Sequence, residues 1–418
     1  MSRLIITGGN KLRGTIDIHG AKNAVLPILA ATILTKGVSV IHNCPRLKDV
    51  NVTVEILRFL GATVTREDNT LVVDSSGDLR YDIPENLMHE LRSSIVFMGA
   101  ILARCKKAKI SSPGGCELGP RPIDLHISSL RELGVSIVET QKFLECDASN
   151  LTSGKLELSF PSVGATENIM LASCIGSGLT TIKNAAKEPE IVDLANFLNK
   201  MGAKISGAGT DTIYIDAVES LCGTEYSIMP DRIAAVTYLC CAAVTGGEII
   251  IKKVNPDNLA ACLDCFARCG CKIGIGDGFV ALKAPNRLQA IEYVETKPYP
   301  GFPTDAQSLF LAMLCTASGR SIIRENIFKS RFNVCSALVN MGADITVTEQ
   351  TALIRGKKCL KGAHVVAPDL RGGAGLIIAA LAANGTTEIE KTCYIDRGYE
   401  DIEENLMRLG AKIMRVPI

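Results

Sequence analysis

The sequence predicts an α/β fold made of six copies of one helix-and-strand unit. Three observations support this prediction: a glycine closes an amphipathic helix six times, an alternating strand pattern follows each of these glycines, and the copies are evenly spaced. The glycines fall at positions 61, 134, 202, 270, 342 and 410, which are 73, 68, 68, 72 and 68 residues apart. Spacing this regular is typical of an internal repeat.

Each copy can be divided into elements in chain order. It begins with a helix of small apolar residues, as at 24–31, 169–175 and 309–315, and a helix with so little polar surface is normally buried. A strand follows, and then an amphipathic helix that ends at the repeat glycine, a residue suited to the left-handed position after a helix. Two strands complete the copy. The predicted order is helix, strand, helix, strand, strand.

A copy of this size cannot enclose its apolar helix alone, so neighbouring copies must share a core. Three copies of ~70 residues make a domain of ordinary size. The sequence therefore predicts two domains, each with approximate threefold symmetry, and a cleft between them. A single ring of six copies is the alternative arrangement.

Composition excludes several classes of function. The chain has 418 residues, 45 Lys and Arg against 44 Asp and Glu, no Trp and 5% aromatic residues, a balance that argues against a nucleic-acid partner. No apolar run approaches the ~20 residues of a membrane span, and no signal peptide is apparent. Sixteen cysteines are too few for a disulfide scaffold in a chain of this length. We expect a cytoplasmic protein with reduced thiols that contacts no membrane.

The starts of the buried helices carry most of the candidate functional residues. Asp231 and Asp369 fit N-caps, and Thr304 with Gln307 fits a capping box. Caps do not explain the cations, which are unfavourable at the positive end of a helix dipole. We therefore expect anions to bind at these starts. The residues there are Lys22 with Asn23, Arg92, Ser162 with Thr166 and Glu167, Asp231 with Arg232, Thr304 with Asp305, and Asp369 with Arg371.

Two groups of cysteines deserve separate interpretations. Cys116 lies in a loop at 112–122 that is rich in Gly and Pro, and Arg121 is close enough in sequence to favour its thiolate; an unreactive surface thiol is the alternative. Cys262, Cys265 and Cys269 follow the buried stripe of a helix, so together with Cys271 they predict core packing rather than a zinc site. The paired glycines at 114–115 and 372–373 match neither a P-loop nor a dinucleotide-binding motif.

Several long motifs, in order over the whole chain, resemble those of the UDP-N-acetylglucosamine 1-carboxyvinyltransferases, a family of enolpyruvyl transferases. They are Gly-Ala-Lys-Asn-Ala at 20–24, Pro-Gly-Gly-Cys-Glu-Leu-Gly-Pro-Arg-Pro-Ile-Asp-Leu-His at 113–126, Ser-Val-Gly-Ala-Thr-Glu at 162–167, Glu-Pro-Glu-Ile-Val-Asp at 188–193, Phe-Pro-Thr-Asp at 302–305 and Asp-Arg-Gly-Tyr-Glu at 396–400.

The resemblance implies two inside-out α/β barrel domains of three repeats each, which decides against a single ring. We expect residues 22–229 to form the domain that carries the Cys116 loop, and residues 1–21 with 230–418 to form the other. The implied reaction transfers the enolpyruvyl group of phosphoenolpyruvate to the 3′-hydroxyl of UDP-N-acetylglucosamine and releases phosphate, with no metal or organic cofactor. This reaction begins peptidoglycan precursor synthesis.

The resemblance also implies roles for individual residues. Cys116 is expected to donate a proton, to form an adduct with phosphoenolpyruvate and to react with fosfomycin, and Asp305 to act as the general base. Lys22, Arg121 and Arg397 are expected around the phosphoenolpyruvate anion. The expected substrate-binding positions are Lys22, Asn23, Lys48, Arg92, Arg121, Pro122, Ile123, Asp124, Leu125, Ser162, Val163, Gly164, Asp305, Ile327, Asp369 and Arg371.

The chain departs from the family pattern at Ala234 and Val236, where Glu and Gly are usual, at Gly372, where Ala is usual, and at Lys187, where Arg is usual. Three alternatives stay open: a 3-phosphoshikimate 1-carboxyvinyltransferase, which lacks the Cys-bearing loop; a catalytically silent paralogue; and an RNA 3′-phosphate cyclase, for which we expect a more basic surface.

Overall fold

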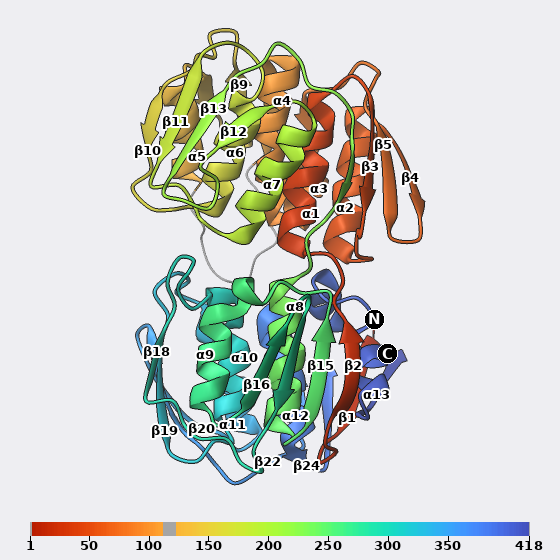
Figure 1. The fold of residues 1–418 in the computed structure, drawn as a ribbon, viewed down its shortest axis with the longest axis vertical. Helices are drawn as coiled ribbons and strands as arrows, with labels where there is room; N and C mark the ends of the chain where they lie inside the picture. The colour runs from red at the N-terminus through yellow and green to blue at the C-terminus, as the bar shows by residue number, and fades with distance from the viewer. Residues whose placement is uncertain (1, 112–122, 418) are drawn as a thin grey trace. The chain divides into compact units, whose positions relative to one another are not determined.

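The computed structural model describes residues 2–111 and 123–417. The chain divides into two compact units (Figure 1). The continuous unit comprises the described residues between Gly20 and Met229, and the split unit comprises residues up to His19 together with those from Pro230 onward. The first crossing lies between His19 and Gly20, two residues before the expected boundary, and the second lies between Met229 and Pro230.

The continuous unit alternates helices and short strands. Its elements are α1 (Lys22–Ala31), η1 (Thr32–Leu34), β3 (Val38–His42), α2 (Lys48–Leu60), β4 (Thr63–Glu67), β5 (Thr70–Asp74), β6 (Asp82–Ile83), α3 (Glu85–Glu90), η2 (Arg92–Val96), α4 (Phe97–Cys105), β7 (Lys107–Ser111), α5 (Asp124–Glu132), β8 (Ser136–Glu139), β9 (Phe143–Asp147), β10 (Lys155–Glu157), α6 (Val163–Ser173), β11 (Leu179–Lys183), α7 (Pro189–Lys200), β12 (Lys204–Ser206), β13 (Thr212–Asp216) and β14 (Glu225–Ser227).

The split unit follows the same scheme. Its elements are β1 (Ser2–Thr7), β2 (Arg13–Asp17), α8 (Arg232–Val244), β15 (Glu248–Lys252), η3 (Pro256–Leu259), α9 (Ala260–Arg268), β16 (Lys272–Gly276), β17 (Phe279–Lys283), β18 (Tyr293–Glu295), α10 (Thr304–Leu314), β19 (Arg320–Arg324), η4 (Arg331–Asn333), α11 (Val334–Asn340), β20 (Asp344–Thr348), β21 (Thr351–Arg355), β22 (Leu360–Lys361), β23 (His364–Val366), α12 (Leu370–Ala382), β24 (Ala383–Asn384), β25 (Thr386–Glu390), η5 (Thr392–Arg397), α13 (Ile402–Arg408) and β26 (Lys412–Pro417).

Within residues 2–111 and 123–417, six four-stranded sheets repeat one topology. The continuous unit has the strand orders β14-β3-β5-β4, β6-β7-β9-β8 and β10-β11-β13-β12, and the split unit has β16-β17-β15-β2, β18-β19-β21-β20 and β23-β25-β1-β26. In each sheet one edge strand is parallel to its neighbour, and the other pairings are antiparallel. The predicted order of helix, strand, helix, strand and strand is confirmed, and the structure adds one short strand before each buried helix.

At the two points where the chain crosses between units, the short added strand pairs within the unit that the chain is leaving. Strand β2 leads in sequence into α1 of the continuous unit but pairs in parallel with β15 of the split unit, with Ile16 opposite Ile251. Strand β14 leads into α8 of the split unit but pairs with β3 of the continuous unit. Each unit thereby receives a strand from the segment that precedes the other unit's first helix.

Each unit has a separate apolar core. Buried side chains between residues 21 and 228 form the core of the continuous unit, and those at 4–18 and 233–413 form that of the split unit. Helices α8, α10 and α12 pack on one another in the split unit, and nearly all their residues are buried. The six repeat glycines all have positive φ, from 86° to 111°, as the sequence predicts for residues that close helices.

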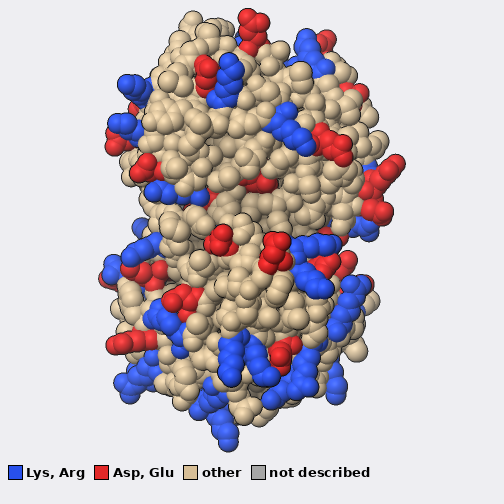
Figure 2. Space-filling view, in the orientation of Figure 1, with Lys and Arg blue, Asp and Glu red and all other residues tan. Residues whose placement is uncertain are grey.

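Other sequence expectations concern thiols, charges and membranes. Cys262, Cys265, Cys269 and Cys271 are buried in the core of the split unit, so the prediction of core packing is confirmed. The view in Figure 2 shows side chains of both charge signs interspersed over the surface. Among helices in residues 2–111 and 123–417, none is long and apolar enough to cross a membrane.

Candidate active site

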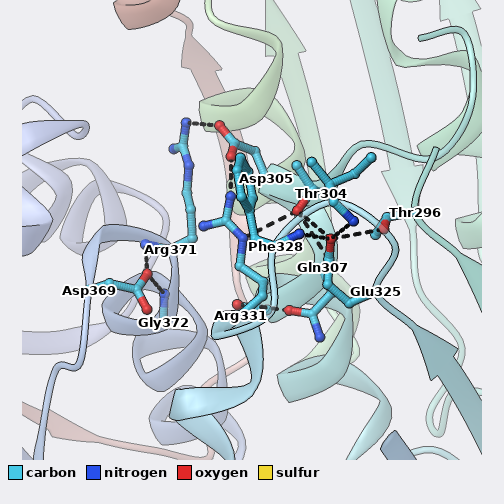
Figure 3. A network of polar contacts seen from close by, with 12 residues as sticks. Thr296, Thr304, Asp305, Gln307, Glu325, Phe328, Arg331, Asp369, Arg371 and Gly372 are labelled. Atoms are coloured by element: carbon cyan, nitrogen blue, oxygen red, sulfur yellow. Dashed lines mark hydrogen bonds and ion pairs between the residues drawn. The ribbon is translucent and has the colours of Figure 1, made fainter. Parts of the chain in front are cut away.

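The carboxylate of Asp305 is held between two arginines of the split unit (Figure 3). Asp305 lies in the first turn of α10. Its Oδ1 accepts a hydrogen bond of 2.6 Å from Arg331, and its Oδ2 accepts one of 2.9 Å from Arg371. The side chains of Arg331 and Arg371 are 2% and 3% exposed, against 24% for Asp305. The carboxylate is therefore fixed by two buried cations, while part of the Asp305 side chain remains exposed.

Arg371 is fixed in turn by a tyrosine. It donates to the hydroxyl of Tyr399 at 3.2 Å, and that hydroxyl lies 2.9 Å from the hydroxyl of Thr237. Burial alone would lower the pKa of Arg371, but the charge of Asp305 and the neighbouring Tyr399 raise it overall. Arg371 therefore stays cationic inside the protein.

Asp369 has the capping position that the sequence predicts. Its Oδ1 accepts from the backbone N–H groups of Arg371 and Gly372 at 2.9 and 3.0 Å, at the start of α12. The structure thus assigns Asp369 a helix cap that positions Arg371. A Cβ at Gly372 would lie 2.7 Å from Cγ of Pro368, so glycine avoids a close contact here.

The capping box predicted for Thr304 and Gln307 is wrong. Pro303 occupies the N-cap, with no side-chain hydrogen bond to the helix. The hydroxyl of Thr304 instead donates to Glu325 at 3.0 Å, and Gln307 is fully buried, with its Oε1 accepting from Ser308. A buried carboxylate distant in sequence competes more strongly for the threonine hydroxyl than the end of the helix does.

Glu325 organises the segment that contains Ile327. It is fully buried, and its Oε1 accepts from the hydroxyl of Thr296 and from the backbone N–H groups of Ile327 and Phe328 at 2.8 to 3.0 Å. Ile327, an expected substrate-binding residue, is thereby anchored two residues from the carboxylate. Neither Glu325 nor Arg331 lies in one of the sequence motifs that predict site residues.

In the continuous unit, Lys22 begins α1, and Asn23 follows it. The Nζ atom of Lys22 lies 2.8 Å from Oδ2 of Asp49, and the two side chains are 12% and 2% exposed. Asp49 is the second residue of α2, after the exposed Lys48. The cation at this helix start is therefore stabilised by a buried carboxylate, and Asp49, like Glu325 and Arg331, was not predicted as a site residue.

The starts of α5 and α6 adjoin each other in the continuous unit. Ser162 caps α6 by accepting from the N–H of Ala165 at 3.3 Å, and Val163 and Gly164 form the first turn. Ile123 precedes α5, which begins with Asp124 and Leu125. The ring of His126 lies against Gly164, since a Cβ there would be 2.9 Å from its Cε1. These two expected binding segments are brought together.

The same unit buries several carboxylates near these helices. Burial raises the pKa of Glu167 well above its ordinary value, and Glu190 and Glu188 add to the rise. Burial also raises the pKa of Asp193 to about 6, although hydrogen bonds from Tyr226 and from the backbone of Met229 oppose the shift. These residues belong to the motifs at 162–167 and 188–193.

Some of the remaining expected residues lie within the described ranges, and others do not. Cys116, Arg121 and Pro122 lie outside the described residues. Arg92 begins η2. Arg397 ends η5, and its side chain is half-buried. The departures Ala234 and Val236 are buried in α8. Within the described ranges, no group of three His, Cys, Asp or Glu side chains could hold a metal ion.

Known proteins resemble this chain over its full length. A relative from Caldanaerobacter subterraneus subsp. tengcongensis, named UDP-N-acetylglucosamine 1-carboxyvinyltransferase 2, is 50% identical, with 100% of each chain covered. Another from Trichlorobacter lovleyi, named UDP-N-acetylglucosamine 1-carboxyvinyltransferase, is 45% identical, with 100% of this chain and 99% of the relative covered. The chain belongs to the UDP-N-acetylglucosamine 1-carboxyvinyltransferase family. The family model described as EPSP synthase (3-phosphoshikimate 1-carboxyvinyltransferase) matches residues 6–406.

Solved structures of other proteins share the fold of this chain. The enolpyruvyl transferase NikO from Streptomyces tendae matches with a TM-score of 0.89 at 26% identity, covering 100% of this chain and 99% of its own. The EPSP synthase from Acinetobacter baumannii matches with a TM-score of 0.77 at 18% identity, with full coverage of both chains. The mixed α/β fold is therefore that of enolpyruvyl transferases.

Proposed function

We propose that this chain transfers the enolpyruvyl group of phosphoenolpyruvate to the 3′-hydroxyl of UDP-N-acetylglucosamine and releases phosphate, the first committed step of peptidoglycan precursor synthesis. The observation that carries the proposal is the Asp305 carboxylate, partly exposed and held by Arg331 and Arg371. Full-length relatives named for this activity support it.

The reaction proceeds by addition and elimination. Asp305 accepts the proton of the 3′-hydroxyl, whose oxygen attacks C2 of phosphoenolpyruvate while C3 receives a proton. The product of this step is a tetrahedral ketal that still carries phosphate. Loss of phosphate from C2 and of a proton from C3 then gives the enol ether. General acid and base groups of this kind contribute about 10²–10⁴-fold to a rate.

Cations must compensate the carboxylate and phosphate of phosphoenolpyruvate. We assign this role to Lys22, Arg121, Arg371 and Arg397. Lys22 and Arg371 are both held by buried or partly buried carboxylates, Asp49 and Asp305. Such pairing keeps the cationic side chains in one orientation before the substrate arrives.

We assign the nucleotide sugar to Arg92, residues 121–125, residues 162–164, Asp305 and Ile327. The first turn of α6 offers backbone N–H groups to a diphosphate. We further propose that each of the two units is an inside-out α/β barrel. Reduced thiols, abundant in this chain, are typical of the cytoplasm, where we place the reaction.

Cys116 is proposed as the proton donor to C3 and as the nucleophile that opens the epoxide of fosfomycin. Fosfomycin should add once to the protein, and Cys116→Ser should abolish the addition. Intact-protein mass spectrometry checks this result, and Cys222→Ser, which removes an exposed thiol, is the matched control. A single adduct retained in the Cys116→Ser variant would assign the reaction to another thiol.

The decisive experiment measures phosphate release from phosphoenolpyruvate with either UDP-N-acetylglucosamine or shikimate 3-phosphate. Release with the UDP-sugar alone is expected. The second candidate, a 3-phosphoshikimate 1-carboxyvinyltransferase, is favoured by the description of the matching family model and predicts release with shikimate 3-phosphate. Release with neither acceptor would indicate a catalytically silent protein.

A further inference from the structure

A buried asparagine joins three segments of the continuous unit. Asn168 lies in α6 and is fully buried. Its Oδ1 accepts from the backbone N–H of Gly99 at 2.7 Å, and its Nδ2 lies 3.0 Å from the carbonyl oxygen of Ile95. Nδ2 also lies 2.7 Å from Nδ1 of His126 in α5. The amide thus connects α6 with α4, η2 and α5.

The two backbone contacts fix the orientation of the amide. Gly99 offers only a donor and Ile95 only an acceptor at these positions, so the amide oxygen must face Gly99 and the NH₂ group must face Ile95. The second hydrogen of the NH₂ group then points at Nδ1 of His126. That nitrogen must accept, and a neutral His126 therefore carries its proton on Nε2.

The amide also takes the place of a helical hydrogen-bond partner. Gly99 and Ile95 are four residues apart, the spacing of an α-helical N–H and carbonyl pair, and Asn168 bonds to both groups where η2 passes into α4. Glycine is required at 99, because a Cβ would lie 2.3 Å from the carbonyl oxygen of Asn168. The side chain is therefore built into the junction of η2 and α4.

The ring of His126, which Asn168 orients, lies next to the start of α6. A Cβ on Gly164 would lie 3.2 Å from Nε2 of His126, so the protonated nitrogen lies beside the first turn of that helix. A helix start and an N–H donor at one place suit an anionic group. Asn168 therefore determines which nitrogen of His126 can donate there.

We propose that Asn168 is a positioning residue that holds His126 as the Nε2–H tautomer, so that His126 donates a hydrogen bond to the diphosphate of the nucleotide sugar at the start of α6. This inference rests on the proposed function. Its first half, the tautomer, is independent of any substrate and can be tested separately.

The tautomer is tested by NMR on the full chain labelled with ¹⁵N-histidine at pH 8. The signals of His126 are identified by their absence in His126→Gln. Long-range couplings between ring nitrogens and ring hydrogens should show Nε2 protonated and Nδ1 unprotonated. A proton on Nδ1, or on both nitrogens at this pH, would overturn the proposal whether or not the protein is an enzyme.

Asn168→Asp should reverse the tautomer. One carboxylate oxygen still accepts from Gly99, and the other then faces Nδ1 of His126, which must become the donor. At pH 8 the KM for UDP-N-acetylglucosamine should rise about tenfold or more, while the KM for phosphoenolpyruvate stays within about twofold. As the pH falls and His126 becomes doubly protonated, Nε2 regains its hydrogen, so the increase in KM should shrink. A purely structural defect would not reverse with pH in this way.

Asn405→Asp is the matched control, because Asn405 is a partly buried asparagine in α13 of the split unit that donates to Tyr238 and to the carbonyl of Glu400. It should leave the KM for the UDP-sugar unchanged at both pH values.

Should Asn168→Asp not fold, His126→Phe, which keeps the ring volume without the donor, should raise the same KM about tenfold. An unchanged KM in the folded variant would overturn the donor role. Absence of phosphate release by the wild-type protein would instead overturn the proposed function and leave the tautomer standing.

Discussion

The Asp305 carboxylate is held by two ion pairs and is still partly exposed to solvent. Its partners Arg331 and Arg371 come from η4 and α12, and both are buried, whereas about a quarter of the Asp305 side chain is exposed. Buried arginines without a carboxylate partner would be strongly unfavourable. Loss of the Asp305 carboxylate would leave both guanidinium groups without this partner, and the same two ion pairs orient the proposed base.

Asp305→Asn should reduce kcat for phosphate release by at least about 100-fold, because an amide cannot accept the hydroxyl proton. Steady-state kinetics with UDP-N-acetylglucosamine checks this. Asp344→Asn is the matched control, since Asp344 also pairs with two cations, Arg355 and Lys357, on the surface. Equal losses in the two variants would show that ion pairing, rather than base catalysis, explains the effect.

Glu325→Ala should raise the KM for the UDP-sugar about tenfold, because it removes the acceptor that anchors Ile327 and Phe328. Buried N–H groups left without an acceptor cost about 1–3 kcal/mol each, so the variant should also be less stable to urea. Glu325→Gln keeps one side-chain oxygen for these donors and should retain most of the affinity. A Gln variant as impaired as the Ala variant would contradict this account.

Residue types at the helix starts could be predicted from local sequence, but their partners could not. Asp231 and Asp369 cap the helices that directly follow them, which is a short-range signal. The partners of Lys22, Thr304 and Asp305 are Asp49, Glu325 and Arg331, each more than 20 residues away. Tertiary packing selects such partners, and no spacing rule within a helix applies to them.

Helices and strands that carry a periodic sequence pattern could be predicted. The repeat glycines and the apolar helices mark most of each copy, whereas the parallel edge strand preceding each buried helix in the chain has only two to five residues. Five of these six strands have only two or three residues, too few to show alternation. The exchange of β2 and β14 between units could not be predicted from local sequence either, because the pairing of β2 with β15 depends on residues more than 230 positions away.

The end of β14 is tied to α7 by Asp193, and this contact should depend on pH. The carboxylate accepts from the hydroxyl of Tyr226 at 2.6 Å and from the N–H of Met229 at 3.2 Å, immediately before the chain crosses to Pro230. Burial raises its pKa from 3.8 to about 6, with a further contribution from Glu190. The native state therefore holds this proton more tightly than the unfolded chain does.

The stability supplied by the raised pKa of Asp193 is fully present below pH 3.8 and is lost as the pH rises through about 6. Relative to Asp193→Asn, which cannot titrate, the wild-type protein should lose about 3 kcal/mol of unfolding free energy between pH 3.5 and pH 7. Urea denaturation of both proteins at matched pH values measures this. A difference that stays constant, or one that grows with pH, would contradict it.

At the scale of the whole molecule, each unit has its own core, but only one unit is continuous in sequence. Residues 20–229 contain every side chain of the first core, from Ala21 to Ile228. Residues 230–418 lack β1 and β2, and with them Leu4, Ile6 and Ile16 of the second core. The fragment 20–229 should therefore fold alone, whereas 230–418 should not.

A circular permutant tests this division of the chain. Strand β1 is an inner strand of its sheet, paired with both β25 and β26, and Ser2 lies opposite Pro417 in the antiparallel pairing with β26. A loop of about two to four residues containing Asn-Gly can join such strands as a hairpin. A chain running from 230 to 417, through this loop, and on to residues 2–19 therefore contains the complete split unit in one piece. It should unfold cooperatively in urea, with circular dichroism typical of an α/β protein, while 230–418 alone should not. Cooperative unfolding of 230–418 without residues 2–19 would show that β1 and β2 are dispensable to this core.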